Sequence, residues 1–210
     1  MMELFLSAFV TLFVVIDPPG CAPIFFGLTG EATPAQRRHM AIRAVIISSF
    51  ILVGFGAVGE DLLRALGISM AAFRIAGGIM LFVIAIDMVF EKRTQRREDR
   101  AQKVKDSPEL DDVSVFLMAM PMIAGPGSIA TIMLLMARAH GPAENAIVLA
   151  ALAANLLLLL IALLTIGPVM RVFGGQVETV ITRLLGVVLA ALAVQFVIDG
   201  LEGSGLLAGH

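Results

Sequence analysis

Asp17-Pro18-Pro19-Gly20-Cys21-Ala22-Pro23 interrupts an otherwise apolar run that extends from residue 4 to residue 28. Proline has no amide donor and its ring clashes with the preceding helical turn, so these prolines preclude one continuous helix. A break inside a membrane leaves backbone groups that lipid cannot satisfy, and it persists only where protein buries it or it lines a cavity. The remaining sequence decides which of these applies.

The composition is that of an integral membrane protein. Hydrophobic residues make up 59% of the 210 residues, and the mean hydropathy is +0.95. Crossing about 30 Å of hydrocarbon takes roughly 20 residues at about 1.5 Å each. Six runs reach or approach that length: 4–28, 41–58, 68–90, 113–137, 146–169 and 180–198. We therefore predict an all-α membrane protein with six transmembrane helices, in which residues 1–210 form a single transmembrane domain.

The basic residues predict the orientation in the membrane. Seven of them lie in the third connection, residues 91–112, and three more flank the first connection. Because cytoplasmic connections carry an excess of Lys and Arg, we predict a multi-pass protein of the cytoplasmic (inner) membrane. Both termini are expected outside, and loop 91–112 is expected in the cytoplasm. The basic residues counted are Arg37, Arg38, Arg43, Lys92, Arg93, Arg96, Arg97, Arg100, Lys103 and Lys105.

A second break of the same kind lies in the fourth apolar run, at Gly125-Pro126-Gly127. Pro19-Gly20 and Pro126-Gly127 are 107 residues apart, and the Arg-x-x-Gly patterns that begin at Arg74 and Arg183 are 109 apart. We predict two diverged three-helix repeats, about 1–90 and 113–201. An odd number of helices inserts the second repeat upside down. Inverted repeats with interrupted first helices, here the first and fourth helices, are typical of secondary transporters.

The two breaks together predict a binding site. The half-helices that begin after Pro19 and Pro126 would both place a positive dipole end near the membrane midplane, and free amides there bind anions. Asp17 adds a carboxylate that needs a cationic partner or a proton. Arg74 is a candidate partner by its depth, although its side chain could instead snorkel outward. Such a site suits a zwitterion, most simply an α-amino acid. The candidate residues are Asp17, Pro18, Pro19, Gly20, Cys21, Gly125, Pro126, Gly127, Ser128, Thr131 and Asn155, with Asp17 and Arg74 as coupling candidates.

Several of these residues also have a structural interpretation. One proline break alone would be typical of a helix kink, whereas two at corresponding positions favour a site. The hydroxyls of Ser128 and Thr131 could bond to their own helix instead of a ligand. Asn155, which corresponds to Ser48 or Ser49 in the second run, could equally hydrogen-bond between helices.

Two stretches resemble the signatures of the MarC family of integral membrane proteins. They are Ile16-Asp17-Pro18-Pro19-Gly20-Cys21-Ala22-Pro23-Ile24-Phe25 and Pro121-Met122-Ile123-Ala124-Gly125-Pro126-Gly127-Ser128-Ile129-Ala130-Thr131. The resemblance extends over essentially the whole chain. It implies a place among the LysE-type amino-acid exporters and transport of small neutral amino acids such as glycine and alanine.

Our leading hypothesis is a secondary transporter of small neutral amino acids that works by alternating access and is coupled to protons or a cation. Drug or metabolite efflux, and a membrane sensor or partner without transport, are the alternatives. The three histidines lie outside the predicted spans and no zinc or P-loop motif occurs, so we expect no enzyme, cofactor, metal or nucleic-acid partner. Small-residue faces on the second and third runs permit a homo-oligomer in the lipid.

Overall fold

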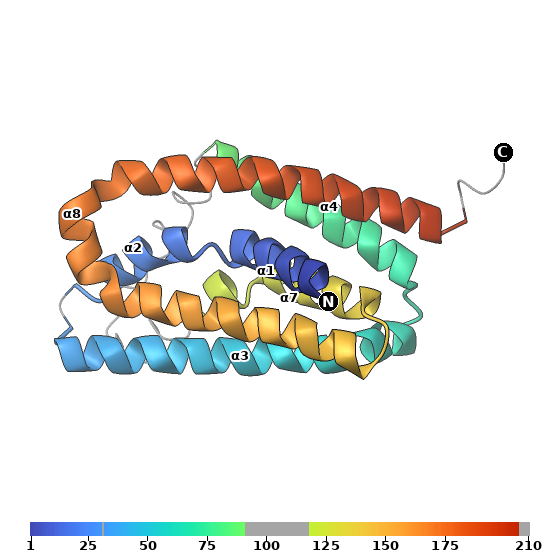
Figure 1. The fold of residues 1–210 in the computed structure, drawn as a ribbon, viewed down its shortest axis with the longest axis horizontal. Helices are drawn as coiled ribbons and strands as arrows, with labels where there is room; N and C mark the ends of the chain where they lie inside the picture. The colour runs from blue at the N-terminus through green and yellow to red at the C-terminus, as the bar shows by residue number, and fades with distance from the viewer. Residues whose placement is uncertain (31, 91–117, 206–210) are drawn as a thin grey trace.

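The computed structural model describes residues 1–30, 32–90 and 118–205, which are helical with no strand among them. The helices are α1 (Met2–Ile16), α2 (Pro18–Leu28), α3 (Pro34–Ala65), α4 (Met70–Val89), the π-helical turn η1 (Met118–Ile123), α7 (Pro126–Arg138) and α8 (Pro142–Gly203) (Figure 1). The predicted all-α fold is confirmed. Loop 91–112 and residues 113–117 of the predicted fourth run lie outside the described residues.

Among the described residues, five segments are long and apolar enough to cross a membrane: Met2–Leu28, Pro34–Ala65, Met70–Val89, Pro142–Ile166 and Val180–Gly203. The segment Met2–Leu28 is the pair α1 and α2, so the first predicted span is interrupted as expected. The described part of the fourth predicted span, from residue 118 on, contains η1 followed by the shorter apolar helix α7, and it is interrupted too.

Local sequence signals set the starts of α3 and α4. Thr33 caps α3 by accepting from the Gln36 amide, the Gln36 side chain accepts from the Thr33 amide, and Pro34 occupies the first helical position. This reciprocal arrangement is the capping box. Ser69 caps α4 by accepting from the amide of Ala72. Both helices therefore begin where their side chains satisfy the first free amides.

Helix α8 contains the fifth and sixth spans in one helix of 62 residues. Figure 1 shows that it folds back on itself, so that its two arms run in opposite directions. We call Pro142–Ile166 the first arm and Val180–Gly203 the second arm. The segment between them contains Gly167-Pro168 and Gly174-Gly175, and Pro and Gly are the residues at which helices bend. The two spans were predicted, but not their helical connection.

Most of the buried apolar residues in the described part of the chain belong to two clusters. The first core joins α1, α2, α3, η1, α7 and the first arm of α8, and it includes Leu12, Phe25, Leu52 and Leu152. The second core joins α4 and the second arm to one side of α1 and of α7; its buried members are Val14, Val15, Leu81, Ala85, Met88, Leu134, Leu189, Ala193 and Phe196. In Figure 1, α1 and α7 lie between the pair formed by α3 with the first arm and the pair formed by α4 with the second arm.

Helix α4 and the second arm of α8 approach each other at backbone distance. A Cβ atom added to Gly78 would lie 2.7 Å from the carbonyl oxygen of Ala193, and one added to Gly200 would lie 2.9 Å from that of Ala71. Small residues allow membrane helices to pack this closely. These two contacts, one at the start of α4 and one near its middle, hold α4 against the second arm.

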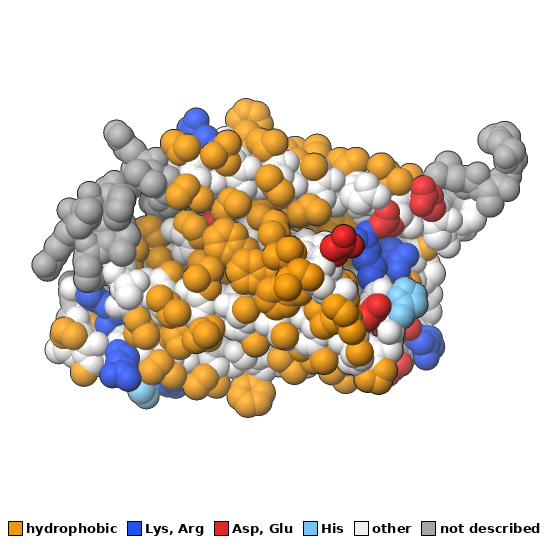
Figure 2. Space-filling view, viewed as in Figure 1, with side chains coloured by type: hydrophobic (Ala, Val, Ile, Leu, Met, Phe, Trp, Pro, Cys, Tyr) orange, Lys and Arg blue, Asp and Glu red, His pale blue; other side chains and the backbone are white. Residues whose placement is uncertain are grey.

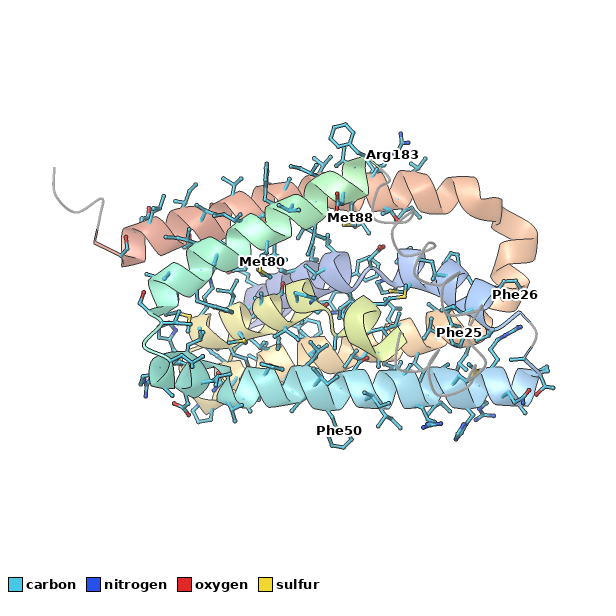
Figure 3. The ribbon with its side chains drawn as sticks, turned by 180° about the vertical axis from the view of Figure 1, so that it is seen from behind. Phe25, Phe26, Phe50, Met80, Met88 and Arg183 are labelled. Atoms are coloured by element: carbon cyan, nitrogen blue, oxygen red, sulfur yellow. The ribbon has the colours of Figure 1, made fainter. Side chains whose placement is uncertain are left out.

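The outer surface is apolar, as a lipid-facing surface must be. Large apolar side chains cover much of the face in Figure 2, and Figure 3 shows Phe50 pointing away from α3, where it is 78% exposed. A soluble monomer rarely exposes contiguous apolar surface of this kind. Hydrocarbon is the solvent that suits it.

Candidate functional site

Asp17 forms the first break, between α1 and α2. Its backbone is left-handed, with φ of 58° and ψ of 64°, which makes it the one non-glycine residue with positive φ in the described part of the chain. Asp and Asn tolerate this conformation better than other residues with side chains. The Asp17 amide still bonds to the Phe13 carbonyl at 2.9 Å and closes α1. The side chain is buried, with 1% of its residue surface exposed.

The carboxylate of Asp17 caps the helix that follows it. Its Oδ1 accepts from the Gly20 amide at 3.2 Å, and its carbonyl accepts from the Cys21 amide at 2.9 Å. Pro18 and Pro19 have no amide hydrogen to offer. The first turn of α2 is therefore satisfied from within, and the expectation of free amides at both half-helices fails at α2.

Two neighbours of Asp17 complete this break. A Cβ atom on Gly20 would lie 2.3 Å from Asp17 Oδ2, so the carboxylate can fold over the helix end only because position 20 is glycine. The thiol of Cys21 donates to the Ile16 carbonyl at 3.3 Å and is fully buried. Gly20 therefore leaves room for the carboxylate of Asp17, and the Cys21 thiol bonds to a backbone carbonyl at the end of α1.

The second break, at Gly125, has no such cap. Gly125 is extended, with φ of −75° and ψ of 173°, and serves as the N-cap of α7 without a side chain. Pro126 follows at the first helical position, which fits because it needs no amide there. Gly125 and Gly127 are buried, whereas Pro126 is exposed. The positive end of α7 thus lacks the carboxylate that α2 has.

The structure brings the two breaks together. A Cβ atom on Gly127 would lie 3.4 Å from Val15 Cγ1, two residues before Asp17, and 2.6 Å from Ile84 Cδ1. Helix α2 also packs against η1, and α1 against α7. The uncapped start of α7 therefore lies against the end of α1 that leads into Asp17.

The two hydroxyl residues of α7 are buried at this end of the helix. Ser128 is 3% exposed and Thr131 is fully buried. The Oγ1 atom of Thr131 has no hydrogen-bond partner among the described residues, so its predicted alternative, a bond to its own helix, is not formed. A buried hydroxyl without a partner is costly, and a polar ligand would satisfy it.

Asn155 lies away from the breaks and links two helices. Its Nδ2 donates to the Phe9 carbonyl of α1 at 3.0 Å and to the Ala151 carbonyl of its own helix at 2.9 Å. Phe9 is eight residues before Asp17, about 12 Å along a helix. The structural interpretation of Asn155 is therefore the one the contacts support.

Ser48, one of the two serines that correspond to Asn155 in sequence, makes the matching contact in the other half, although it was not among the predicted site residues. Its Oγ donates to the Ala44 carbonyl at 2.8 Å and to the Ala119 carbonyl of η1 at 3.3 Å. Ser48 and Asn155 are 107 residues apart, the same offset that relates the two breaks. Each bonds to the first half of the interrupted span in the other predicted repeat, although the inverted repeat itself stays a prediction.

Arg74 is not beside Asp17, which corrects the proposed pairing. It is the fifth residue of α4, lies close enough to Arg138 to act on it electrostatically, and its Nη1 would be 3.8 Å from a Cβ on Gly203. Arg138 ends α7 and Gly203 ends α8. Arg74 therefore lies at the end of the bundle where α7 and α8 end, and no ion pair joins it to Asp17 within the described residues.

Comparison with known proteins agrees with the resemblance. The model of the MarC family of integral membrane proteins matches residues 2–204. The UPF0056 membrane protein YvbG of Bacillus subtilis is 36% identical over 203 residues, 97% of this chain and 96% of that protein. A UPF0056 membrane protein of Methanocaldococcus jannaschii is 33% identical over 97% of this chain and 98% of its own length.

A third relative, the UPF0056 membrane protein YhcE of Escherichia coli, is 30% identical over 93% of this chain and 90% of its own. No solved structure matches the chain. The family match covers nearly the whole chain, including both breaks and all the helices. This chain belongs to the MarC family of integral membrane proteins.

Proposed function

We propose that the protein is a secondary transporter of small neutral amino acids, such as glycine or alanine, which works by alternating access and is coupled to protons or another cation. The observation that supports it most is the contact between the two breaks at Val15 and Gly127. This contact joins a buried carboxylate region to an uncapped helix N-terminus. Opposite charges of this kind suit the two ends of a zwitterion.

The substrate carboxylate would bind at the start of α7. A helix N-terminus carries about half a positive charge, and the amides of Gly127 and Ser128 have no capping side chain in competition. The Thr131 hydroxyl, which lacks a partner among the described residues, supplies a further donor nearby. Because the α2 N-terminus is already capped by Asp17, the anion would bind on the α7 side.

Asp17 would take the ammonium group and couple transport to a cation. Asp17 is 1% exposed and lies two residues after Val15, which faces the start of α7, so a substrate ammonium bound at the break would lie close to its carboxylate. Buried acids inside membranes commonly mark ion and proton pathways. The same resemblance that implies amino-acid export agrees with this assignment.

Asp17→Asn in liposomes tests the proposal. Asn tolerates the left-handed backbone and caps helices as well as Asp does, so this variant removes the charge while keeping the cap. We expect wild-type protein to take up labelled glycine or alanine saturably and faster with a proton gradient. Asp17→Asn should lower that uptake at least tenfold without changing the yield of folded protein.

Asp61→Asn is the matched control, because Asp61 is an exposed carboxylate whose Oδ1 lies 3.5 Å from Arg64 at the end of α3. It should transport like wild type. The absence of saturable amino-acid uptake by wild type, or full uptake by Asp17→Ala, would contradict the mechanism. Uptake of apolar drugs in place of amino acids would favour the efflux alternative.

A further inference from the structure

Two arginines and one aspartate meet at the end of the bundle where α7 and α8 end. Arg138 forms an ion pair with Asp199, and its guanidinium carbon lies 4.5 Å above the centre of the Phe196 ring. Asp199 also accepts from Gln195 Nε2 at 2.7 Å. Arg74 of α4 reaches the same part of α8, because its Nη1 would be 3.8 Å from a Cβ atom on Gly203, four residues after Asp199. This cluster is separate from the two breaks.

Positive charge exceeds negative charge within this cluster. Asp199 is shared between Arg138 and Gln195, which leaves Arg74 without an acidic partner among the described residues. The Nε atom of Arg74 is buried and has no hydrogen-bond partner there. A guanidinium with a desolvated, unpaired N–H is destabilised, so a second acceptor at this position would stabilise the fold.

The cluster lies near the ends of α7 and α8, and the ends of transmembrane helices border the lipid headgroups. Arg138 is the last residue of α7, and Asp199 is four residues before the end of α8. The side chains of Arg138 and Asp199 are 34% and 24% exposed, and Figure 2 shows basic side chains flanked by acidic ones at this end. On the same arm, Val194 and Ile198 are 45% and 40% exposed, so apolar surface adjoins the charged cluster.

We propose that Arg74 and Arg138 together bind a phosphate group, which an anionic phospholipid supplies from the adjoining membrane. Guanidinium groups match phosphate oxygens through paired hydrogen bonds, and the Arg74 Nε is the donor that lacks a partner. The exposed apolar side chains beside the cluster would contact the acyl chains. Free phosphate shares this chemistry and is the second source to be tested.

The binding test uses the single cysteine as its reporter. Cys21 is the one cysteine in the chain and is fully buried, so a fluorogenic maleimide reacts with it only as the protein unfolds. Delipidated protein in detergent is titrated with dioctanoyl phosphatidylglycerol, with dioctanoylglycerol, which has the chains without the phosphate, or with inorganic phosphate. We expect a saturable rise of the melting temperature with phosphatidylglycerol and none with dioctanoylglycerol.

The variants separate binding from folding. Arg74→Gln and Arg138→Gln should weaken phosphatidylglycerol binding at least tenfold, whereas Arg64→Gln should leave it unchanged. Arg64 is a 73% exposed arginine at the same end that pairs with Glu60 and Asp61. Asp199→Asn removes the competing carboxylate and should tighten binding several-fold, a gain that a merely structural cluster would not give.

Each result decides the proposal. If inorganic phosphate raises the melting temperature as much as phosphatidylglycerol does, the cluster is a phosphate site whose ligand is the free anion. Equal stabilisation by dioctanoylglycerol, wild-type affinity in both Arg74→Gln and Arg138→Gln, or weaker binding by Asp199→Asn would overturn it. Failure of amino-acid transport would leave it untouched, because the two sites share no residue.

Discussion

For Asp17, the sequence predicts a break in the helix but not the backbone conformation of the residue. The prolines around it predict a break, and its charge predicts a partner. The structure gives it a left-handed backbone and a carboxylate that turns back onto the Gly20 amide. That local bond was not predicted, because the sequence gives no φ angle. The clue was the glycine three residues later, which leaves room for the carboxylate.

Gly20→Ala tests this relation directly. The new Cβ would lie 2.3 Å from Asp17 Oδ2, so the carboxylate must turn away and the cap is lost. Loss of an N-cap costs about 1 kcal/mol, and we expect a lower melting temperature by maleimide reaction with Cys21. Gly27→Ala in the same helix, with nothing within 4 Å of its Cβ, is the control. A Gly20→Ala protein as stable as Gly27→Ala would contradict the tight cap.

Arg74 shows the limit of reasoning from depth alone. The sequence places it inside an apolar run, but α4 begins at Met70, so Arg74 is only in its second turn. A long arginine side chain near a helix end reaches the interface. Its neighbours come from α7 and α8, far away in the sequence, and no local pattern announces them.

Among the helices, α4 and the second arm of α8 form the closest pair. Gly78 and Gly200 allow this close approach, which was not predicted. The span boundaries were only partly predictable. Helix α3 extends from Pro34 to Ala65, well beyond the apolar run 41–58, because charged and polar residues continue a helix past the hydrocarbon region without appearing in an apolar count.

Gly78→Ala should disturb this pair. Its Cβ would lie 2.7 Å from the Ala193 carbonyl oxygen, and backbone atoms cannot move aside as a side-chain end can. Overpacking of this kind costs about 1–3 kcal/mol, measured as a lower melting temperature or an earlier midpoint in a detergent-denaturation titration. Gly54→Ala in α3 has open space around its Cβ and should be neutral. Equal stability of the two variants would mean that the helices separate easily.

For the molecule as a whole, the helical class, the span positions and both breaks were predictable, since hydropathy and proline are local signals. The inverted relation of the halves remains a prediction that two observations favour. The paired contacts of Ser48 and Asn155 share one offset. The arginines of the two Arg-x-x-Gly patterns also lie toward opposite ends of α4, as an inverted repeat predicts. Arg74 lies near the end of α8 at Gly203, and Figure 3 shows Arg183 near Met88, toward the other end of α4.

The predicted orientation can be tested by cysteine labelling. In a Cys21→Ala background, Asp61→Cys and Arg38→Cys each place one exposed thiol at an opposite end of α3. We expect a membrane-impermeant maleimide to label Asp61→Cys in right-side-out vesicles and to label Arg38→Cys only after permeabilisation. The reverse pattern would mean that both termini face the cytoplasm and that the basic residues do not set the orientation.

The division of the interior into two cores has a mechanical consequence. The first core groups α2 and α3 with the first arm, the second groups α4 with the second arm, and α1 and α7 contribute to both. If the helices of one core rocked against those of the other, the packing along α1 and α7 would have to slide. Such motion is easiest where a helix is already interrupted, and the interruptions at Asp17 and Gly125 adjoin α1 and α7. Relative motion of the two groups of helices would therefore be concentrated at the residues proposed to hold the substrate.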